Sequence, residues 1–342
     1  MSVKYFLFYI LHFKFYILHS LMRTLSGIQP SGQLHLGNYF GSMKPNIDRI
    51  GGGESLYLIV DLHALTTVQD PEALKKYRRD AVLDCLACGF DPEKAILFFQ
   101  SDVPEHAGLS WILSTVTPMG LLERAVSYKE KIEKGLPASA GLFTYPVMMA
   151  ADILLYQANQ VPVGRDQKQH VEITRDIAVK FNNTYSETFV LPEPMIEKEV
   201  AVVPGIDGQK MSKSYGNTIP IFGPEKAIEK TIMSIVTDSK AVSDPKDPET
   251  CTVFQIHKLF LNAEEQKALA RRYKSGGLGY GDAKKLLFQA YLDYFGAMRE
   301  KREDLLKKPD YVAKVIKSGA EKASVLAKKT MAKVREATGL VD

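Results

Sequence analysis

The sequence predicts an α/β fold in which a doubly wound parallel sheet is followed by a separate all-helical domain. Short apolar runs typical of buried strands alternate with longer segments of helical periodicity before about residue 220. Beyond residue 221 the strand-like runs stop and only helical patterns follow. A chain of 342 residues with 45% hydrophobic composition can bury a large core and form one large and one smaller domain.

The pattern places four strands and the helices between them. Asp70 and Pro71 form an N-cap and first-turn pair for a helix that continues to about Cys88. Helical patterns also cover 105–115 and 121–156, and Asp166 is placed to cap the next helix. The predicted strands are 24–28, 55–60, 95–99 and 161–163. Because such sheets bind ligands at the carboxyl ends of their strands, we expect the turns after the first and last strands to meet in one site.

The second half of the chain predicts a helical domain covering residues 221–342, after an α/β domain covering 22–220. Helical patterns occupy 224–237, 282–295 and 311–337, and the last helix can return to pack on the first domain. Residues 301–342 hold eleven Lys or Arg against six Asp or Glu. This bias suits a surface that faces a nucleic acid and, equally, a solvated helix face.

Composition limits the remaining possibilities. The formal net charge of +4 permits nucleic-acid binding without requiring it. Three cysteines, two of them paired as Cys85 and Cys88, indicate a reducing compartment and no disulfide framework, and lack the ligands for a metal site. Residues 1–21 are aromatic and apolar but too short and interrupted to span a membrane, so we interpret them as an extension outside the domain pattern, disordered or non-native. The less favoured alternative is an organelle-targeting leader, which the lack of Arg and the shortage of Ser disfavour.

Two segments are built to handle phosphate. Residues 26–41 (SGIQPSGQLHLGNYFG) form a Gly- and Ser-rich turn between a strand and a helix, where exposed N–H groups, with His35, can meet phosphate oxygens and Gly37 leaves room for a base. Residues 209–214 (QKMSKS) place Lys210 and Lys213 on a Gly-punctuated loop. Two ammonium groups there can follow the charge on a leaving pyrophosphate once the loop closes.

These two segments resemble the signature motifs of class I aminoacyl-tRNA synthetases, with residues 35–38 (HLGN) in place of the sequence HIGH. Residues 141–156 (GLFTYPVMMAADILLY) and 161–170 (VPVGRDQKQH) resemble the bacterial-type tryptophanyl-tRNA synthetase family. The resemblance runs from about Met22 to the C-terminus. It implies a Rossmann-like catalytic domain and a helical domain that reads the tRNA anticodon.

The resemblance also implies roles for particular residues. Arg165 departs from the family's frequent Glu, and Leu25 from an aromatic of the amino-acid pocket. The catalytic residues would be His35, Asn38, Lys210 and Lys213. The ATP-binding residues would be Gln29, Pro30, Ser31, Gly37, Asn38, Gly164, Arg165, Asp166, Val203, Lys210, Met211, Ser212, Lys213 and Ser214. The tryptophan-binding residues would be Asp152, Tyr145, Met149, Val161, Val163 and Gln167.

Selection of the amino acid is predicted to rest on Asp152. Helical spacing aligns Tyr145, Met149, Asp152 and Tyr156 on one face, with no cation within one turn. An isolated buried carboxylate is costly, so we expect the indole N–H of a bound tryptophan to satisfy it. The alternative from the residues alone is a structural Asp paired with a distant Arg.

The predicted reaction is ATP-dependent formation of tryptophanyl-adenylate, followed by transfer to tRNA(Trp). By resemblance the protein would be a cytoplasmic homodimer that uses ATP with Mg²⁺ held by the phosphates, without a protein-bound metal or iron–sulfur cluster and without a membrane partner. Three alternatives remain open: a tyrosyl-tRNA synthetase, a plain nucleotidyltransferase, and a non-catalytic tRNA- or nucleotide-binding paralogue. A paralogue of that kind often loses its loop lysines or motif histidine, all of which this chain retains.

Overall fold

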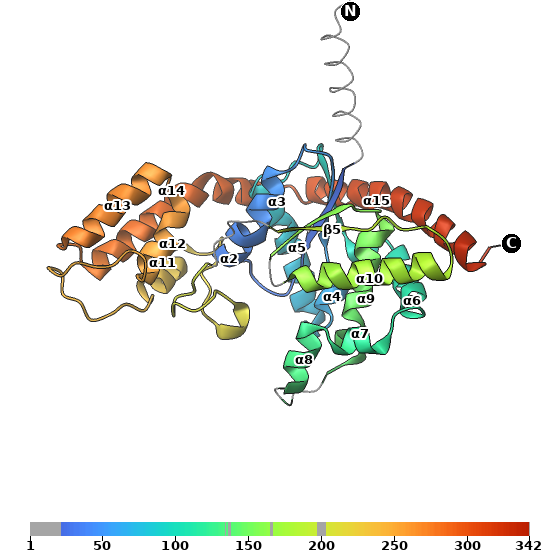
Figure 1. Cartoon of the computed structure of the whole chain (residues 1–342). Helices are drawn as coiled ribbons and strands as arrows, with labels where there is room; N and C mark the ends of the chain where they lie inside the picture. Colours follow the sequence, from blue (N-terminus) through green and yellow to red (C-terminus); the bar gives the residue numbers. More distant parts are fainter. Residues whose placement is uncertain (1–21, 134, 136–137, 165–166, 197–202, 342) are drawn as a thin grey trace, which may run out of the picture.

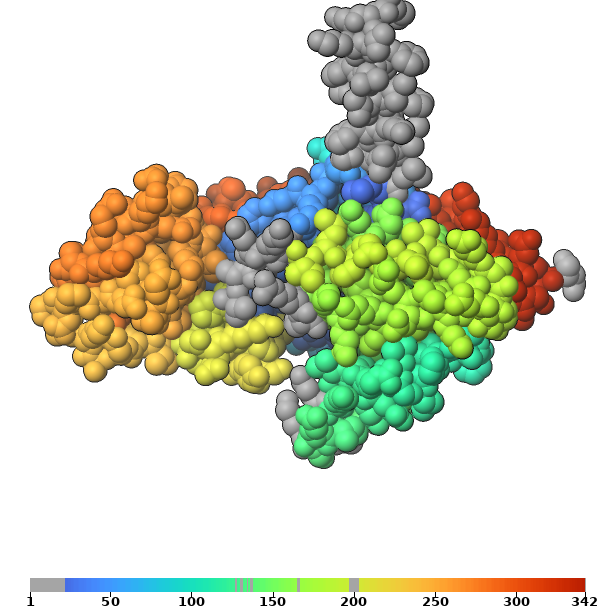
Figure 2. All heavy atoms as spheres, viewed as in Figure 1, coloured from blue at the N-terminus to red at the C-terminus, as the bar shows by residue number. Residues whose placement is uncertain are grey.

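The computed structural model describes residues 22–133, 135, 138–164, 167–196 and 203–341. The extension predicted for residues 1–21 lies outside that range. The described chain forms an elongated molecule, with orange helices at one end and green and red elements at the other (Figures 1 and 2).

A parallel five-stranded sheet of order β3-β2-β1-β4-β5 forms the centre. Successive strands step outward from β1 in one direction and then, from β4, in the other, which places a topological switch point between β1 and β4. The strands are β1 (Arg23–Ile28), β2 (Glu54–Ile59), β3 (Ala95–Phe99), β4 (Gln160–Val163) and β5 (Glu193–Ile196). The α/β architecture predicted from the sequence is confirmed.

Helices cover both faces of this sheet, because alternate residues of its strands enter two different cores. On β2, Tyr57 and Ile59 pack in one core, and Leu56 and Leu58 in the other. The longer helices of this region are α5 (Pro71–Ala87), α6 (Glu105–Ser114), α8 (Val126–Glu133), α9 (Ala140–Leu155) and α10 (Lys168–Thr184). The shorter ones are α2 (Leu36–Asn38), η1 (Tyr39–Met43), α3 (Lys44–Asp48), α4 (Asp61–Ala64), η2 (Gln100–Asp102) and α7 (Met119–Glu123).

From the end of the QKMSKS loop onward, the regular elements of the described chain are all helices. The elements are η4 (Lys213–Tyr215), α11 (Glu225–Met233), α12 (Thr252–His257), η5 (Lys258–Phe260), α13 (Ala263–Ser275), α14 (Tyr280–Leu306) and α15 (Pro309–Thr338). α11 to α14 gather at the orange end, whereas α15 returns along the sheet to the opposite end (Figure 1). Gly319 of α15 faces β3 so closely that a Cβ atom there would lie 1.9 Å from the Leu97 carbonyl oxygen.

Arg302 of α14 joins the helical end to the sheet region. Its Nε donates to Asp84 (2.6 Å) and its Nη2 to Asp80 (2.9 Å), both on α5. Burial raises the pKa of Asp84 to about 6 although the Arg302 charge opposes the rise. The C-terminal helices are therefore tied to the sheet region by this ion pair as well as by α15.

Candidate active site

The site lies where the strands end. The His35 turn follows β1, His63 follows β2, Gln100 follows β3 and Gly164 follows β4. The carboxyl ends of parallel strands share one edge of the sheet, and the β1 and β4 turns flank the switch point. The sequence prediction that these two turns meet near the switch point agrees with this topology.

The His35 turn is held by a reciprocal cap. His35 is the N-cap of α2: its Nδ1 accepts the Asn38 N–H (3.3 Å), while the Asn38 Oδ1 accepts the His35 N–H (3.3 Å). Burial, followed by the charge of Lys213, lowers the pKa of His35 to about 4. The ring is therefore neutral at pH 7, and because Nδ1 is an acceptor its proton lies on Nε2. That tautomer suits His35 for the predicted donation to a phosphate oxygen.

The QKMSKS loop and the segment that follows it, which includes Ile219 and Ile221, dock on this turn. The Leu36 N–H donates to the Ile219 carbonyl (2.9 Å), the Ile221 N–H to Leu34 (3.1 Å), and the Gly37 N–H lies 3.4 Å from the Met211 Sδ. A Cβ atom at Gly37 would lie 3.0 Å from the His35 ring. The same atom would lie 3.5 Å from the Met211 Cβ, so a side chain at this position would crowd both motif residues; the room predicted for a base stays a prediction.

Lys213 contacts the His35 turn, although more than half the length of the chain separates the two in sequence. Its Nζ donates to the Gly32 carbonyl (3.1 Å), and burial lowers its pKa. We had expected this lysine to engage only after the loop closes, yet here it already contacts the turn. Lys210 and Ser214 are exposed on the same loop, Ser212 is half-buried, and Met211 and Val203 are buried.

Asn217, which the sequence did not suggest, organises the loop. It is buried, and its Nδ2 donates to the Asp207 Oδ1 (2.8 Å) and the Lys210 carbonyl (3.1 Å). Its Oδ1 accepts the Ser212 N–H (2.8 Å). One side chain thus fixes the backbone on both sides of Met211, within the segment that carries Lys210 and Lys213, and Gly205 leaves the room that this amide needs.

Asp152 occupies the centre of the predicted amino-acid pocket, on α9, and is 3% exposed. It is not isolated. Its Oδ1 accepts from the Gln100 Nε2 (2.7 Å) and lies 2.6 Å from the His106 Nδ1, and its Oδ2 lies 2.9 Å from the His63 Nε2. The prediction of a lone carboxylate that waits for a ligand donor is wrong, and so is the alternative of a distant Arg.

These contacts decide the charge of Asp152. Burial raises the pKa of this carboxyl, but hydrogen bonds from His106 and His63 outweigh it and lower the pKa to about 2. A carboxylate has about four acceptor positions, of which these contacts use three. Counting the contacts of the described residues, one position remains for a donor on a ligand.

A second layer holds the three partners. The His106 Nε2 lies 2.8 Å from the Tyr156 hydroxyl, and the Gln100 Oε1 accepts the N–H groups of Leu62 (3.1 Å) and His63 (3.4 Å). Sequence reasoning missed these partners because they lie 46 to 89 positions from Asp152. Their position in the sequence could have indicated them, because His63 and Gln100 follow the carboxyl ends of β2 and β3 within a few residues.

Of the other residues predicted to bind tryptophan, four lie on α9 or pack beside it and one is exposed. Tyr145 packs against His63 with ring centroids 6.3 Å apart, and its hydroxyl lies 2.9 Å from the His170 Nε2. Val161 is buried, and Met149 and Val163 are half-buried, all at the core below α9. Gln167 is exposed at the N-cap of α10, so the structure does not turn it into this core.

The remaining predicted ATP contacts lie around the same edge. The Gln29 amide lies 3.4 Å from the His63 carbonyl and links the β1 turn to the β2 turn. Pro30 is buried, and the Ser31 N–H donates to the Gln29 carbonyl (2.9 Å). The Gly164 carbonyl accepts the Gln167 N–H (2.9 Å). Arg165 and Asp166, including the cap predicted for Asp166, lie outside the described residues.

Within the part of the chain that the structure describes, no group of three or more His, Cys, Asp or Glu is placed to hold a metal ion. Over the same residues, no helix is long and apolar enough to cross a membrane.

Comparison with known proteins agrees with this geometry. The model of a family described as tRNA synthetases class I (W and Y) matches residues 19–296. A tryptophan–tRNA ligase from Fusobacterium nucleatum is 52% identical over 322 residues, covering 94% of this chain and 99% of the relative. Another, from Campylobacter jejuni, is 53% identical over 319 residues, covering 93% of this chain and 100% of the relative.

A solved structure is similar over the same length. The tryptophanyl-tRNA synthetase from Campylobacter jejuni, complexed with ADP and tryptophan, matches with a TM-score of 0.87 and 53% identity, covering 93% of this chain and 100% of that one. Because the family model spans most of the chain and these relatives align over almost their full length, this chain belongs to the class I tRNA synthetases of the tryptophan and tyrosine family, among the bacterial tryptophanyl-tRNA synthetases.

Proposed function

We propose that this chain is a tryptophan–tRNA ligase, which activates L-tryptophan with ATP and transfers it to tRNA(Trp). The observation that carries this conclusion is the likeness, at 53% identity over 93% of the chain, to a structure complexed with ADP and tryptophan. The site supports it: a charged, buried acceptor and a lysine-bearing loop occupy one edge of the sheet.

On the amino-acid side, the role we assign to Asp152 is selection by a hydrogen bond. Its ionised carboxylate offers one remaining acceptor position among apolar side chains, which suits an indole N–H. His63, Gln100 and His106 keep the carboxylate charged and fixed before the ligand arrives. A preorganised acceptor discriminates strongly against ligands that lack the donor, because it would then lose its partner.

On the nucleotide side, the reaction needs positioning and charge stabilisation. The tryptophan carboxylate attacks the α-phosphate, a carboxyl O–P bond forms, and the P–O bond to pyrophosphate breaks. We assign His35 Nε2–H to a phosphate oxygen and the ammonium groups of Lys210 and Lys213 to the negative charge on the leaving pyrophosphate. The neutral His35 ring and the contact of Lys213 with Gly32 support this assignment.

Mg²⁺ enters this proposal with ATP, held by the phosphates, and would offset their charge.

The tRNA and dimer assignments are also proposals. The basic C-terminal helices suit tRNA, with residues 221–342 reading the anticodon, and Trp111 and Met119, 74% and 62% exposed near one another in sequence, suit contact with a second copy. Function in translation places the protein in the cytoplasm.

Tryptophan-dependent exchange of pyrophosphate into ATP tests the function. We expect exchange with tryptophan at least a thousandfold (roughly 4 kcal/mol) above exchange with tyrosine or phenylalanine. Aminoacylation of purified tRNA(Trp) follows the second step. Exchange that depends on tyrosine alone would overturn the assignment, and nucleotidyl transfer without any amino acid would point to a plain nucleotidyltransferase.

A further inference from the structure

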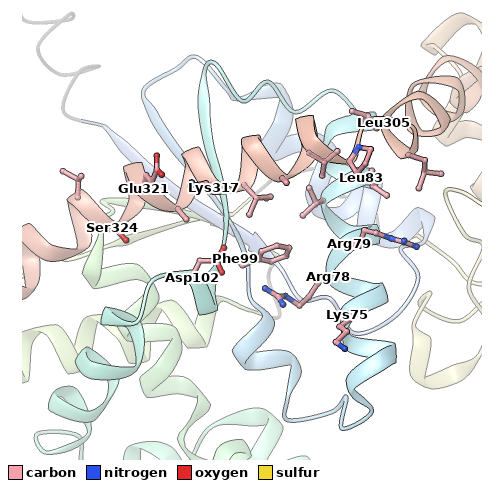
Figure 3. Close-up of a pocket in the computed structure, with 18 of the residues that line it drawn as sticks. Lys75, Arg78, Arg79, Leu83, Phe99, Asp102, Leu305, Lys317, Glu321 and Ser324 are labelled. Carbon is pink, nitrogen blue, oxygen red and sulfur yellow. The ribbon is translucent and has the colours of Figure 1, made fainter.

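A large groove between α5 and α15 takes no part in the proposed site. It has a volume of about 1140 Å³, somewhat above the usual range of about 300–1,000 Å³ for small-molecule pockets. Figure 3 shows Leu83 and Leu305 at one end, Glu321 and Ser324 at the other, and Arg78 with Phe99 between them. α5 supplies one wall, the end of α14 and α15 supply the other, and the end of β3 with η2 supplies the floor.

The lining is apolar with a basic rim. Leu83, Leu305 and Ile316 form an apolar patch, and Val312 and Leu306 extend it. Five basic side chains line the groove against the two acids Asp102 and Glu321. The basic ones are Lys75, Arg78, Arg79, Lys317 and Lys328. The complementary ligand is a molecule with one acidic group and an apolar body.

Arg78 connects this groove to the interior. Its guanidinium lies 4.1 Å from the centroid of Phe99, and its Nε lies 2.8 Å from the Asp61 Oδ2. Its side chain is 30% exposed, whereas that of Asp61 is 4% exposed. An anion in the groove can therefore reach Arg78 and compete with Asp61 for it.

Asp61 is connected to the proposed tryptophan site through a residue near it and a residue next to its partner Ser101. It accepts the Ser101 N–H (2.9 Å) and the Ser101 hydroxyl (2.6 Å), which fixes the turn after β3. The preceding residue, Gln100, donates to Asp152, and His63, two residues after Asp61, contacts the other carboxylate oxygen. Two of the three groups that hold Asp152 thus depend on turns that the Arg78–Asp61 pair joins.

We propose that the groove between α5 and α15 binds a small amphipathic carboxylate, and that this ligand weakens tryptophan binding by drawing Arg78 away from Asp61. The claim that the groove binds a carboxylate depends only on the groove. The claim that this ligand weakens tryptophan binding also depends on the proposed function. Coupling free energies are reciprocal, so tryptophan must weaken the carboxylate by the same factor.

Decanoate is the probe, titrated below its micelle-forming concentration into the full chain by isothermal calorimetry. We expect decanoate to bind, and decanol and decyltrimethylammonium, which have the same chain length, not to bind. Reversing the rim charge with Lys75→Glu and Arg79→Glu, both on α5 and outside the proposed machinery, should weaken decanoate at least tenfold and leave tryptophan-dependent exchange unchanged. Equal binding of decanol, or no effect of the reversal, overturns the claim that the groove binds a carboxylate.

The coupling has its own arm. Saturating decanoate should raise the dissociation constant for tryptophan about fivefold, at the low end of usual coupling. The Asp61→Asn variant, which releases Arg78 without changing the groove, should bind decanoate severalfold more tightly and tryptophan more weakly, and should no longer show coupling. Decanoate binding with an unchanged tryptophan constant overturns the coupling.

The two proposals fail separately. A chain that binds decanoate but gives no tryptophan-dependent exchange retains the groove assignment and loses the proposed ligase function. If the chain exchanges normally and does not bind decanoate, but binds an acidic helical peptide in the same groove, the small carboxylate is the wrong ligand. The proposed ligase function is then retained.

Discussion

Asp152 shows how a residue can be located from sequence while its surroundings cannot. The apolar helix around it predicted burial, and the carboxylate is buried. Its hydrogen-bonding partners come from segments that follow other strands, so no local pattern could reveal them. The physical rule that a buried charge needs partners was correct; assigning that role to the ligand alone was the error.

We expect Asp152→Asn to raise the KM for tryptophan roughly ten- to hundredfold, because hydrogen bonds to a charged acceptor contribute about 1.5–3 kcal/mol. An amide also cannot accept from Gln100 and both histidines as a carboxylate does. Tryptophan-dependent pyrophosphate exchange measures the effect, with the KM for ATP as the internal reference. The exposed Asp176→Asn variant is the matched control, and equal KM values in both variants would refute the role.

We expect His35 to stay neutral down to about pH 5 and to take up a proton only near pH 4. The unfolded chain binds this proton more readily between pH 4 and 6.5, so His35 lowers the free energy of unfolding as the pH falls through that window. Proton NMR titration of the ring, assigned with a His35→Gln variant, gives the pKa. Lys213→Met should raise it, and a wild-type value near 6.5 would contradict the buried, neutral ring.

At the scale of elements, prediction succeeded where a start signal coincided with an apolar pattern. The helix capped by Asp70 runs over α5, with the Asp70 carboxylate accepting the Glu72 N–H (3.0 Å). β5 was missed because four residues that include Pro194 carry little strand preference. α13 was missed although Asn262 and Glu265 form a capping box, a signal that was present in the sequence.

The QKMSKS loop depends on one buried amide, so we expect Asn217→Ala to lower kcat for exchange about ten- to hundredfold. The dissociation constant for tryptophan should not change, because Asp152 and its partners do not contact this loop residue. Stopped-flow adenylate formation and equilibrium tryptophan binding separate the two effects. Tyr215→Ala, on the exposed side of the loop, is the control, and loss of tryptophan affinity in Asn217→Ala would indicate general unfolding instead.

At the scale of the whole molecule, the site depends on elements that sequence places far apart. The loop that follows the β5 region docks on the β1 turn, and α15 covers β3, whose carboxyl end supplies Gln100. The alternation of strands and helices predicted the sheet and its catalytic edge. The contact between α15 and β3 depends on helix-to-strand distance, which periodicity does not encode.

Because α15 packs so closely on β3, replacing a helical glycine by alanine should have opposite effects on stability in α15 and in α14. We expect Gly319→Ala to lower the free energy of unfolding by about 2 kcal/mol or more, because the new Cβ would lie 1.9 Å from the Leu97 carbonyl oxygen and would push α15 off β3. Gly296→Ala in α14 meets nothing within 4 Å, so it should instead stabilise the chain by roughly 0.5–1 kcal/mol through helix propensity. Urea unfolding of both variants measures the difference. Since β3 leads into Gln100, Gly319→Ala should also weaken tryptophan binding, and equal stability of the two variants would show that α15 does not hold the sheet.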